Sequence, residues 1–237
     1  MNENVEKKLW KNVYKVLPSL KSVPFLKMVA VCNNLAFGKV DEESDIDLFI
    51  VSEKGRLFMV RFLVTLILQL KGVRRHGKEV AGKFCLSFFV DEEFMNLKKI
   101  AIENDIYLSY WIKTIVPVID DGVYLKFIDE NKWTDDFFAE KTSRDDHQKI
   151  EINSGYKKIW TWVLNGVFGD FLEFVLRKWQ MKRAKIKAEK ADGKASLLIQ
   201  EHILKFHNID RRSYYRDLWF AKYGVGSKLT KEKFLSL

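Results

Sequence analysis

Two aspartates precede the most strand-like run of this chain. Residues 44–51 read Ser-Asp-Ile-Asp-Leu-Phe-Ile-Val, and the four apolar residues at the end of that run are typical of a buried strand. Alternate side chains of a strand share one face, so we expect Asp45 and Asp47 to point the same way, about 7 Å apart. Because Asp is a poor strand former and two carboxylates on one face repel each other, the pair predicts a bound cation.

Carboxylate oxygens are hard ligands, and a pair of them suits Mg²⁺, which binds through one or two carboxylates together with substrate phosphates. The pattern therefore indicates metal-dependent phosphoryl chemistry with Asp45 and Asp47 as the metal ligands. An isolated Asp-x-Asp often only ends a turn or caps a helix. Here an apolar run at 27–31 and a polar turn at 38–44 come first, and the order strand, loop, acidic strand is more specific than the two aspartates alone.

The same stretch resembles the signature of the nucleotidyltransferase superfamily that includes DNA polymerase β and the small stand-alone nucleotidyltransferases. That signature is an apolar residue, Gly-Ser, a short spacer, and then Asp-apolar-Asp-apolar. In this chain Asn33 and Asn34 stand where Gly-Ser is expected, and residues 45–48 complete the pattern. Asn tolerates the left-handed backbone region better than most residues, so Asn33 can replace the glycine. Asn34 can still donate a hydrogen bond.

The resemblance implies an α/β (α+β) fold in which a palm-like mixed sheet with helices is followed by an α-helical C-terminal subdomain. It also implies an enzyme that moves a nucleoside monophosphate from a nucleoside triphosphate to an acceptor hydroxyl. Asp45 and Asp47 would then be catalytic and hold Mg²⁺, while Asn33, Asn34 and Ser44 would bind the nucleotide. The acceptor stays open among an RNA end, an antibiotic, a protein hydroxyl and a small metabolite.

A third acidic residue, which the resembled family carries on a later strand, has no counterpart inside the strand-like run at 83–90. Cys85 or Ser87 stands at the expected position, and the acids of residues 91–93 come only at the end of the run. Without that carboxylate a hydroxyl nucleophile lacks an obvious general base. Either an acid at 91–93 substitutes, or the nucleophile is activated otherwise, or catalysis is lost. The last case describes a catalytically degenerate fold that binds nucleic acid or a protein.

Net charge indicates an anionic ligand. The 237 residues carry a formal charge of +9, which favours nucleic acid, nucleotides or an anionic membrane surface. The loop at 72–83 contributes Arg74, Arg75, His76 and Lys78, which either contact phosphates or are simply solvated. Near the end of the chain, phosphate-holding and base-stacking residue types gather as Arg211, Arg212, Tyr214 and Tyr215. The same residues also suit the charged rim of a packed helix.

Other features narrow the class of protein. The first ten residues have mixed charge and no apolar core, so we expect no signal peptide. No uncharged apolar stretch reaches the length of a spanning helix, so we expect no integral membrane segment. Cys32 and Cys85 both fall in strand-like runs and are expected to be buried thiols in a reducing, cytoplasmic compartment.

Apolar periodicity predicts strands over 26–32, 45–52 and 83–90, and helices over 4–18, 56–71, 105–115, 159–181 and 195–206. We expect the Val-Pro-Val-Ile run at 116–119 to break the third of these helices. The polar segment 134–155 predicts a boundary between a nucleotidyltransferase-like domain, 1–133, and a basic helical subdomain, 134–237. The aromatic helix at 159–181 is expected in the core of that subdomain, with a membrane-surface helix as the alternative.

Overall fold

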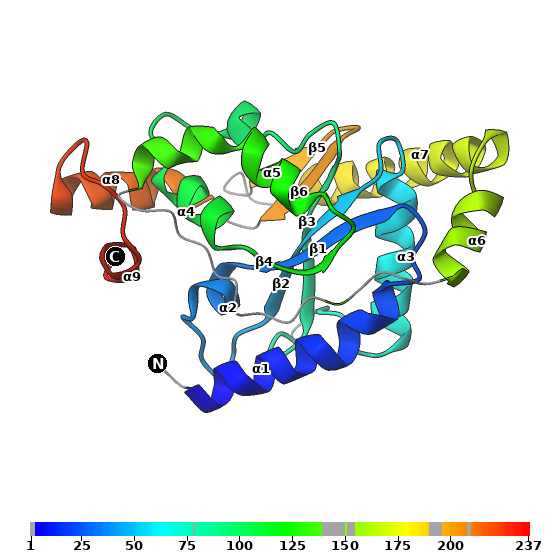
Figure 1. Ribbon diagram of the computed structural model, residues 1–237, viewed down its shortest axis with the longest axis horizontal. Coiled ribbons are helices and arrows are strands. Elements are labelled where there is room, and N and C mark those ends of the chain that lie inside the picture. Colours follow the sequence, from blue (N-terminus) through cyan, green and yellow to red (C-terminus); the bar gives the residue numbers. More distant parts are fainter. Residues whose placement is uncertain (1–2, 78, 139–149, 151–154, 190–195, 208–209) are drawn as a thin grey trace.

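A six-stranded mixed sheet forms the centre of the computed structural model, which describes residues 3–77, 79–138, 150, 155–189, 196–207 and 210–237 (Figure 1). The strands are β1 (Leu26–Cys32), β2 (Ile46–Ser52), β3 (Phe84–Asp91), β4 (Val116–Asp120), β5 (Ser196–Ile199) and β6 (Ile203–His207). In space their order is β4-β1-β2-β3-β6-β5. The pair β2–β3 is parallel and the other neighbouring pairs are antiparallel. The expected mixed α/β fold is thereby confirmed.

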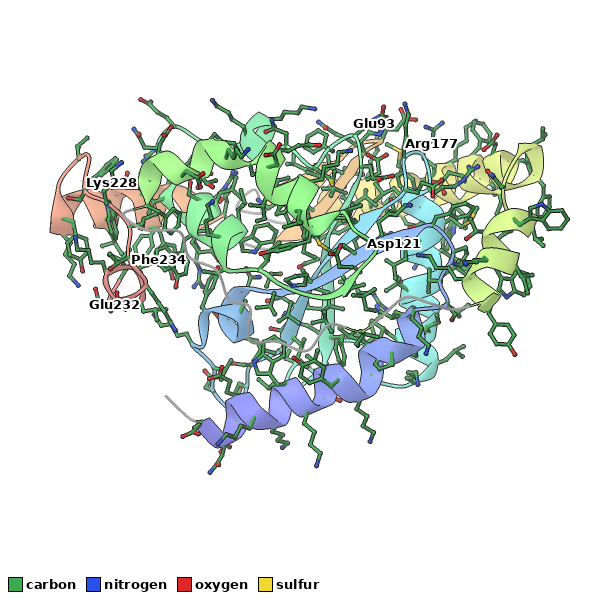
Figure 2. The ribbon with its side chains drawn as sticks, in the orientation of Figure 1. Glu93, Asp121, Arg177, Lys228, Glu232 and Phe234 are labelled. Carbon is green, nitrogen blue, oxygen red and sulfur yellow. The ribbon has the colours of Figure 1, made fainter. Side chains whose placement is uncertain are left out.

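Helices pack around this sheet. They are α1 (Glu3–Val16), α2 (Asn33–Phe37), α3 (Leu57–Leu70), α4 (Ile106–Thr114), α5 (Tyr124–Glu130), α6 (Gly155–Val163), α7 (Val167–Glu189), α8 (Arg212–Tyr223) and α9 (Lys231–Leu235). Short 3₁₀-helices, η1 (Leu17–Leu20), η2 (Leu97–Ile100) and η3 (Lys132–Phe137), join some of them. Figure 1 shows α6 and α7 at one end of the long axis and α8 and α9 at the other. Phe234 of α9 stacks on Tyr110 of α4, with 3.7 Å between ring centroids, and so packs the last helix against the body of the protein (Figure 2).

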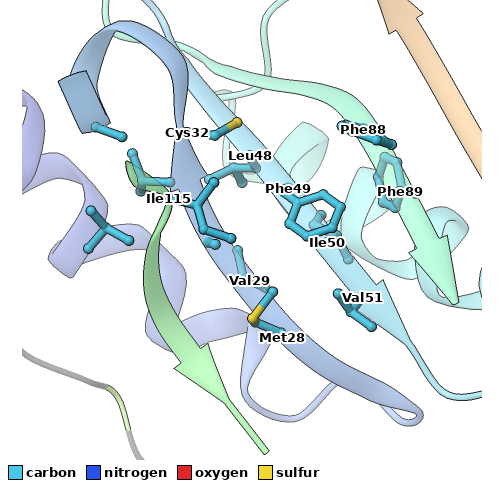
Figure 3. Close-up of a cluster of buried hydrophobic side chains, with 14 of the residues drawn as sticks. Met28, Val29, Cys32, Leu48, Phe49, Ile50, Val51, Phe88, Phe89 and Ile115 are labelled. Atoms are coloured by element: carbon cyan, nitrogen blue, oxygen red, sulfur yellow. The ribbon is translucent and has the colours of Figure 1, made fainter. Parts of the chain in front are cut away.

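The central strands β1 and β2 are buried along nearly their whole length, which explains their almost continuous apolar sequences. Phe49 of β2 lies 5.0 Å from Phe88, measured between ring centroids, in the core that Figure 3 shows. Its ring centroid also lies 5.1 Å from that of Trp111 of α4. Within β2, Asp47 is the one residue that is only half-buried. The single break in the buried pattern of this strand is therefore a carboxylate.

Most of the predicted elements are confirmed. The three predicted strands and the helices over 4–18, 56–71 and 105–115 correspond to β1, β2, β3, α1, α3 and α4, with ends within two residues of the expected ones. These are the elements whose own sequences carry the apolar period of their structure. Asp105 confirms the expected start of α4, because its side chain accepts a hydrogen bond from Leu108 N at 2.9 Å.

The helix predicted over 195–206 is wrong, because this segment forms the hairpin β5–β6 and completes the sheet. Residues 203–205 of β6 pair with residues 88–90 of β3. The exposed edge of β3 offers hydrogen-bond partners that a local sequence pattern does not reveal. The C-terminal part of the chain is consequently not wholly helical. The run at 116–119, expected only to end a helix, forms the edge strand β4, where Pro117 needs no ladder donor on its outer side.

The aromatic helix expected at 159–181 is two helices, α6 and α7, with a break that includes Gly166 at φ +79°. The expectation that it is a core helix is wrong for α6, since α6 has no buried residue. The predicted boundary at 134 stays a prediction, and most of the segment 134–155 lies outside the described residues.

Candidate functional site

A tight turn connects β1 to α2 and brings two asparagines to the edge of the sheet. Cys32 ends β1 in extended conformation, and Asn33 begins α2 with φ +55°. This left-handed conformation confirms the expectation that Asn33 occupies a position suited to glycine. Gly38 then ends α2 with φ +75°, and its N–H donates to the carbonyl oxygens of Asn34 and Leu35. Asn33 and Asn34 both line a cavity of about 550 Å³.

Asp45 and Asp47 lie at the start of β2 beside this turn. Cys32 of β1 pairs with Asp47 on one side, and Cys85 of β3 pairs with Asp47 on the other. One carboxylate oxygen of each aspartate and Cys85 Sγ all lie within 4.8 Å of one another. The structure thus brings the two predicted metal ligands together with the residue that stands at the third acidic position.

Electrostatics at this cluster are unfavourable for two free carboxylates. Burial, together with the neighbouring charge of Asp45, raises the pKa of Asp47 to about 6, although hydrogen bonds from Asn33 and Cys85 and the charge of Arg75 oppose the rise. Burial, followed by the two aspartates, also raises the pKa of the Cys85 thiol far above its ordinary value. The thiol is therefore neutral at physiological pH, and a bound cation would relieve the repulsion between the carboxylates.

The acids at 91–93 do not join this cluster. Asp91 pairs with Ser52 at the opposite end of β2 and β3, and its carboxylate lies 2.8 Å from His202 Nδ1. Asp91, Glu93 and His202 form a separate group. Cys85 and Ser87 are instead the β3 residues nearest the aspartates, with Ser87 Oγ 3.5 Å from Asp47 Oδ1. Substitution of the third carboxylate by residues 91–93 is thereby excluded.

Basic side chains from two distant segments line the same cavity. Arg74, Arg75 and His76 come from the loop after α3, and Arg211 comes from the start of α8. Main-chain hydrogen bonds hold the loop along β3: Phe84 N donates to Val73 O and Arg75 N donates to Phe84 O, both at 2.9 Å. The loop residues are predicted as phosphate contacts or solvated side chains, and Arg211 as a phosphate contact or part of the charged rim of a helix. The structure gathers all four near Asp47. Lys78 of the same loop lies outside the described residues.

Two predicted residues have structural partners instead. Ser44 Oγ donates to Asp41 Oδ1 at 2.8 Å and accepts from Asp41 N at 2.9 Å, so this hydroxyl fixes the turn before β2. Arg212 Nη1 and Nη2 contact the carboxylates of Asp105 and Asp210, at 3.3 and 2.6 Å. Both side chains therefore hold the walls of the site in place, and neither lines the cavity.

Three features of the site were not predicted. Arg75 Nη1 lies 2.5 Å from Asp45 Oδ2, so the loop arginine is an ion-pair partner of a predicted metal ligand. Tyr107 of α4 lines the cavity and stacks on Tyr215 of α8, with 5.1 Å between ring centroids. Phe206 of β6 lines it as well. The last two could not be found from the sequence, because their position depends on how α4, α8 and the hairpin pack on the sheet.

Comparison of the chain with models of known protein families, with curated proteins and with solved structures finds no match.

Proposed function

We propose that this chain is a Mg²⁺-dependent nucleotidyltransferase that moves a nucleoside monophosphate from a nucleoside triphosphate to an acceptor hydroxyl. The observation that carries the proposal is that Asp47 and the left-handed turn at Asn33 line one basic cavity, with a carboxylate oxygen of Asp45 within 4.8 Å of one of Asp47. Mixed sheet, turn and acidic strand occur in the order that the resemblance to the DNA polymerase β superfamily implies. The palm-like character of the sheet is part of this proposal.

The donor set fits a hard divalent cation. Asp45 and Asp47 supply carboxylate oxygens close enough to share one ion. Because the Cys85 thiol is neutral, these oxygens alone determine which metal the site prefers. When bound, Mg²⁺ would neutralise and orient the phosphate oxygens of the nucleotide. Such a charge would also stabilise the ionised form of Asp47, whose pKa burial and the charge of Asp45 raise.

The chain's own residues would hold and orient the triphosphate. Arg74, Arg75 and Arg211 line the cavity and can donate charge-assisted hydrogen bonds to phosphate oxygens. Asn33 and Asn34 would position the phosphates at the turn, and Tyr107 forms an aromatic wall. In the transfer the acceptor oxygen bonds to the α-phosphorus, the bond from that phosphorus to the bridging oxygen breaks, and pyrophosphate leaves with the electron pair. The hydroxyl proton passes to water.

One specific observation favours a second candidate, a catalytically degenerate fold that binds nucleic acid or a protein. Arg75 already neutralises Asp45 at 2.5 Å, and a thiol stands at the third acidic position. In that case Arg75 would take the place of the cation, and the basic cavity would contact a polyanion without transferring a group.

Titration calorimetry with the four nucleoside triphosphates tests the proposal, with and without Mg²⁺. Asp45→Asn and Asp47→Asn are compared with Asp217→Asn, which removes an exposed carboxylate on α8 that pairs with Arg216. We expect micromolar Mg²⁺-dependent binding that both site variants abolish and the control retains. If the folded wild type binds none of the triphosphates, catalysis is refuted. RNA binding that weakens steeply with salt and ignores chelators would then support the second candidate.

A further inference from the structure

Three arginines without acidic partners meet in a second cavity, of about 510 Å³, between α3 and α7. They are Arg61 of α3, Arg74 of the following loop and Arg183 of α7. Among the residues that the structure describes, no carboxylate forms an ion pair with any of the three, whereas the arginines at 56, 75, 177, 212 and 216 each have one. Within the described part of the chain, the cavity therefore concentrates positive charge that no ion pair neutralises.

Arg61 is the most constrained of the three. Its Nη1 donates to Gln180 Oε1 at 2.6 Å, and its guanidinium lies over the ring of Phe206, 4.8 Å from the centroid. Its Nε is buried and has no hydrogen-bond acceptor among the residues that the structure describes. Burial, followed by the charges of Arg74 and Arg183, lowers the pKa of Arg61 to about 10. A buried donor without an acceptor and a charge without a counter-charge both cost free energy, and one bound anion would remove both costs.

The walls of the cavity indicate the kind of anion. Trp179, Phe62 and Phe206 form apolar walls beside the arginines, and Gln69 and Gln180 add amides. This combination suits a phosphate group attached to an organic body, because guanidinium groups bind phosphate oxygens in pairs while the rings cover the body. Arg183 itself lies over the Trp179 ring at 5.2 Å and is exposed, so an incoming ligand can reach it.

The second cavity adjoins the candidate active site. Arg74, Leu86 and Phe206 line both. We propose that the arginine cavity binds a phosphate monoester and that the acceptor hydroxyl of the reaction belongs to a phosphorylated molecule held there. The acceptor role rests on the proposed nucleotidyltransferase function, whereas phosphate binding by Arg61, Arg74 and Arg183 does not.

Calorimetry in the presence of a chelator tests the cavity apart from the candidate metal site. The probes are inorganic phosphate, ribose 5-phosphate and hexauridylate RNA with a 5′-phosphate. Arg61→Gln and Arg183→Gln are compared with Arg177→Gln, a control on α7 whose arginine pairs with Glu201 (Figure 2). We expect each cavity variant to weaken phosphate binding about tenfold or more, and the control to match the wild type. Because Arg183 is exposed, Arg183→Gln gives the answer even if Arg61→Gln does not fold.

Each outcome separates the cavity from the catalytic proposal. Binding of ribose 5-phosphate as tight as that of the RNA assigns the cavity to a small phosphorylated acceptor, and much tighter binding of the RNA assigns it to an RNA end. Absence of phosphate binding, or equal binding by wild type and variants, overturns the phosphate site even if Mg²⁺-dependent triphosphate binding is found. Phosphate binding that depends on Arg183, without triphosphate binding in the wild type, keeps the site and refutes the catalytic function.

An independent observation concerns α6 and α7, which expose many large apolar side chains. The buried face of α7 combines the polar Glu173 and Gln180 with Leu176 and Ala184. Outside the arginine cavity, α6 and α7 expose large apolar side chains: Tyr156, Ile159, Trp160, Trp162, Val163, Val167, Phe168, Phe171, Phe174, Val175 and Ile186. Many large exposed apolar side chains on two consecutive helices mark an interaction site, since water solvates them poorly.

Charge and shape of this helix pair favour an anionic membrane as the partner. Among the side chains that the structure describes, its exposed basic ones outside the arginine cavity are Lys158, Lys178, Lys182 and Lys185, against one exposed acid, Asp170, which pairs with Arg56 at 2.6 Å. Two copies of such a basic face would repel each other, whereas anionic lipid head groups would attract it. Among the described residues no single helix is long and apolar enough to cross a membrane, and α6 with α7 meets that requirement only as a pair bent by 87°. We propose that α6 and α7 lie in the interface of an anionic bilayer.

Co-sedimentation with vesicles tests this docking. One set of vesicles is phosphatidylcholine, and the other is equal parts phosphatidylcholine and phosphatidylglycerol. The double variant Trp162→Ser/Phe168→Ser is compared with Leu125→Ser, which removes an exposed leucine of α5. We expect the wild type to sediment with the anionic vesicles, and the double variant to bind these vesicles at least about tenfold more weakly. Wild type that stays in solution with both kinds of vesicle overturns the proposal. A wild-type dimer that the double variant does not form also overturns it, and assigns the face to a second copy of the chain.

Discussion

Helix α3 receives its N-terminal cap from a residue far away in the sequence. Its own N-cap residue, Arg56, makes no side-chain capping bond, and its first turn holds no acid. Glu173 of α7 supplies both missing acceptors, with Oε1 2.8 Å from Phe58 N and Oε2 2.8 Å from Met59 N. Since Arg61 lies one turn further along α3, this carboxylate also helps to position the arginine cavity.

Glu173→Ala should therefore lower the free energy of unfolding substantially. It leaves two buried N–H groups without acceptors, at about 1–3 kcal/mol each, and removes a favourable charge at a helix N-terminus worth about 0.3–1 kcal/mol. Burial raises the pKa of Glu173 above its ordinary value, which means that the carboxylate itself is costly to bury and that its removal returns part of the loss. We expect a net loss of about 3 kcal/mol, or a melting temperature lower by about 6–12 °C.

Urea denaturation followed by far-ultraviolet circular dichroism measures this loss, with an unchanged slope against urea as the sign that the same structure unfolds. Glu173→Gln keeps one acceptor and should fall between wild type and alanine. Asp170→Ala, nearly one turn earlier on α7, removes an exposed carboxylate that pairs with Arg56 and should cost at most about 1 kcal/mol. A Glu173→Ala loss no larger than that of Asp170→Ala would refute the capping argument.

Substitutions at three further positions test other parts of the fold, each by denaturation. Asn131 is fully buried, and its side chain makes four hydrogen bonds, so Asn131→Ala should cost about 3–4 kcal/mol. Burial, followed by the charge of Arg212, lowers the pKa of Lys205 from 10.5 to about 8. The unfolded chain then binds this proton more tightly than the folded chain does. The free energy of unfolding of the wild type should therefore rise by about 3 kcal/mol, relative to that of Lys205→Met, as the pH is raised from about 8 to about 10.5. At pH 7 Lys205→Met should be the more stable protein. At the left-handed Asn33, Asn33→Gly should change stability by less than about 0.5 kcal/mol, whereas Asn33→Val should cost about 1–2 kcal/mol.

The local pattern of apolar residues in the sequence is sufficient to predict the strand and helix that follow the two aspartates. The apolar run after Asp47 predicted β2, and the sixteen-residue apolar run at 56–71 predicted α3, because burial on several sides leaves its signature in the sequence itself. The conformation of Asn33 was equally accessible, since few side chains tolerate a positive φ.

Elements that are stabilised by segments far away in the sequence cannot be predicted from the local pattern. The run at 196–207 has apolar spacing compatible with a helix, and only the free edge of β3 selects the strand pairing. Pro117 predicts a break because the local sequence does not reveal that its strand lies at the edge of the sheet. The ion pair between Arg75 and Asp45 and the cluster at Arg61 likewise arise from packing between segments, so composition could indicate an anionic ligand without indicating where it binds.

Pairing of β6 with β3 has a consequence for how the protein is made. Residues 88–90 read Phe-Phe-Val, and their partners in the sheet are residues 203–205. During synthesis on the ribosome the N-terminal strands emerge long before those partners do. The N–H and C=O groups of this apolar edge therefore stay unpaired until residues 203–205 have been synthesised. A nascent chain in that state can recruit strands from its neighbours. Release of the finished chain, or shielding by a chaperone until then, therefore decides how much of the protein escapes aggregation.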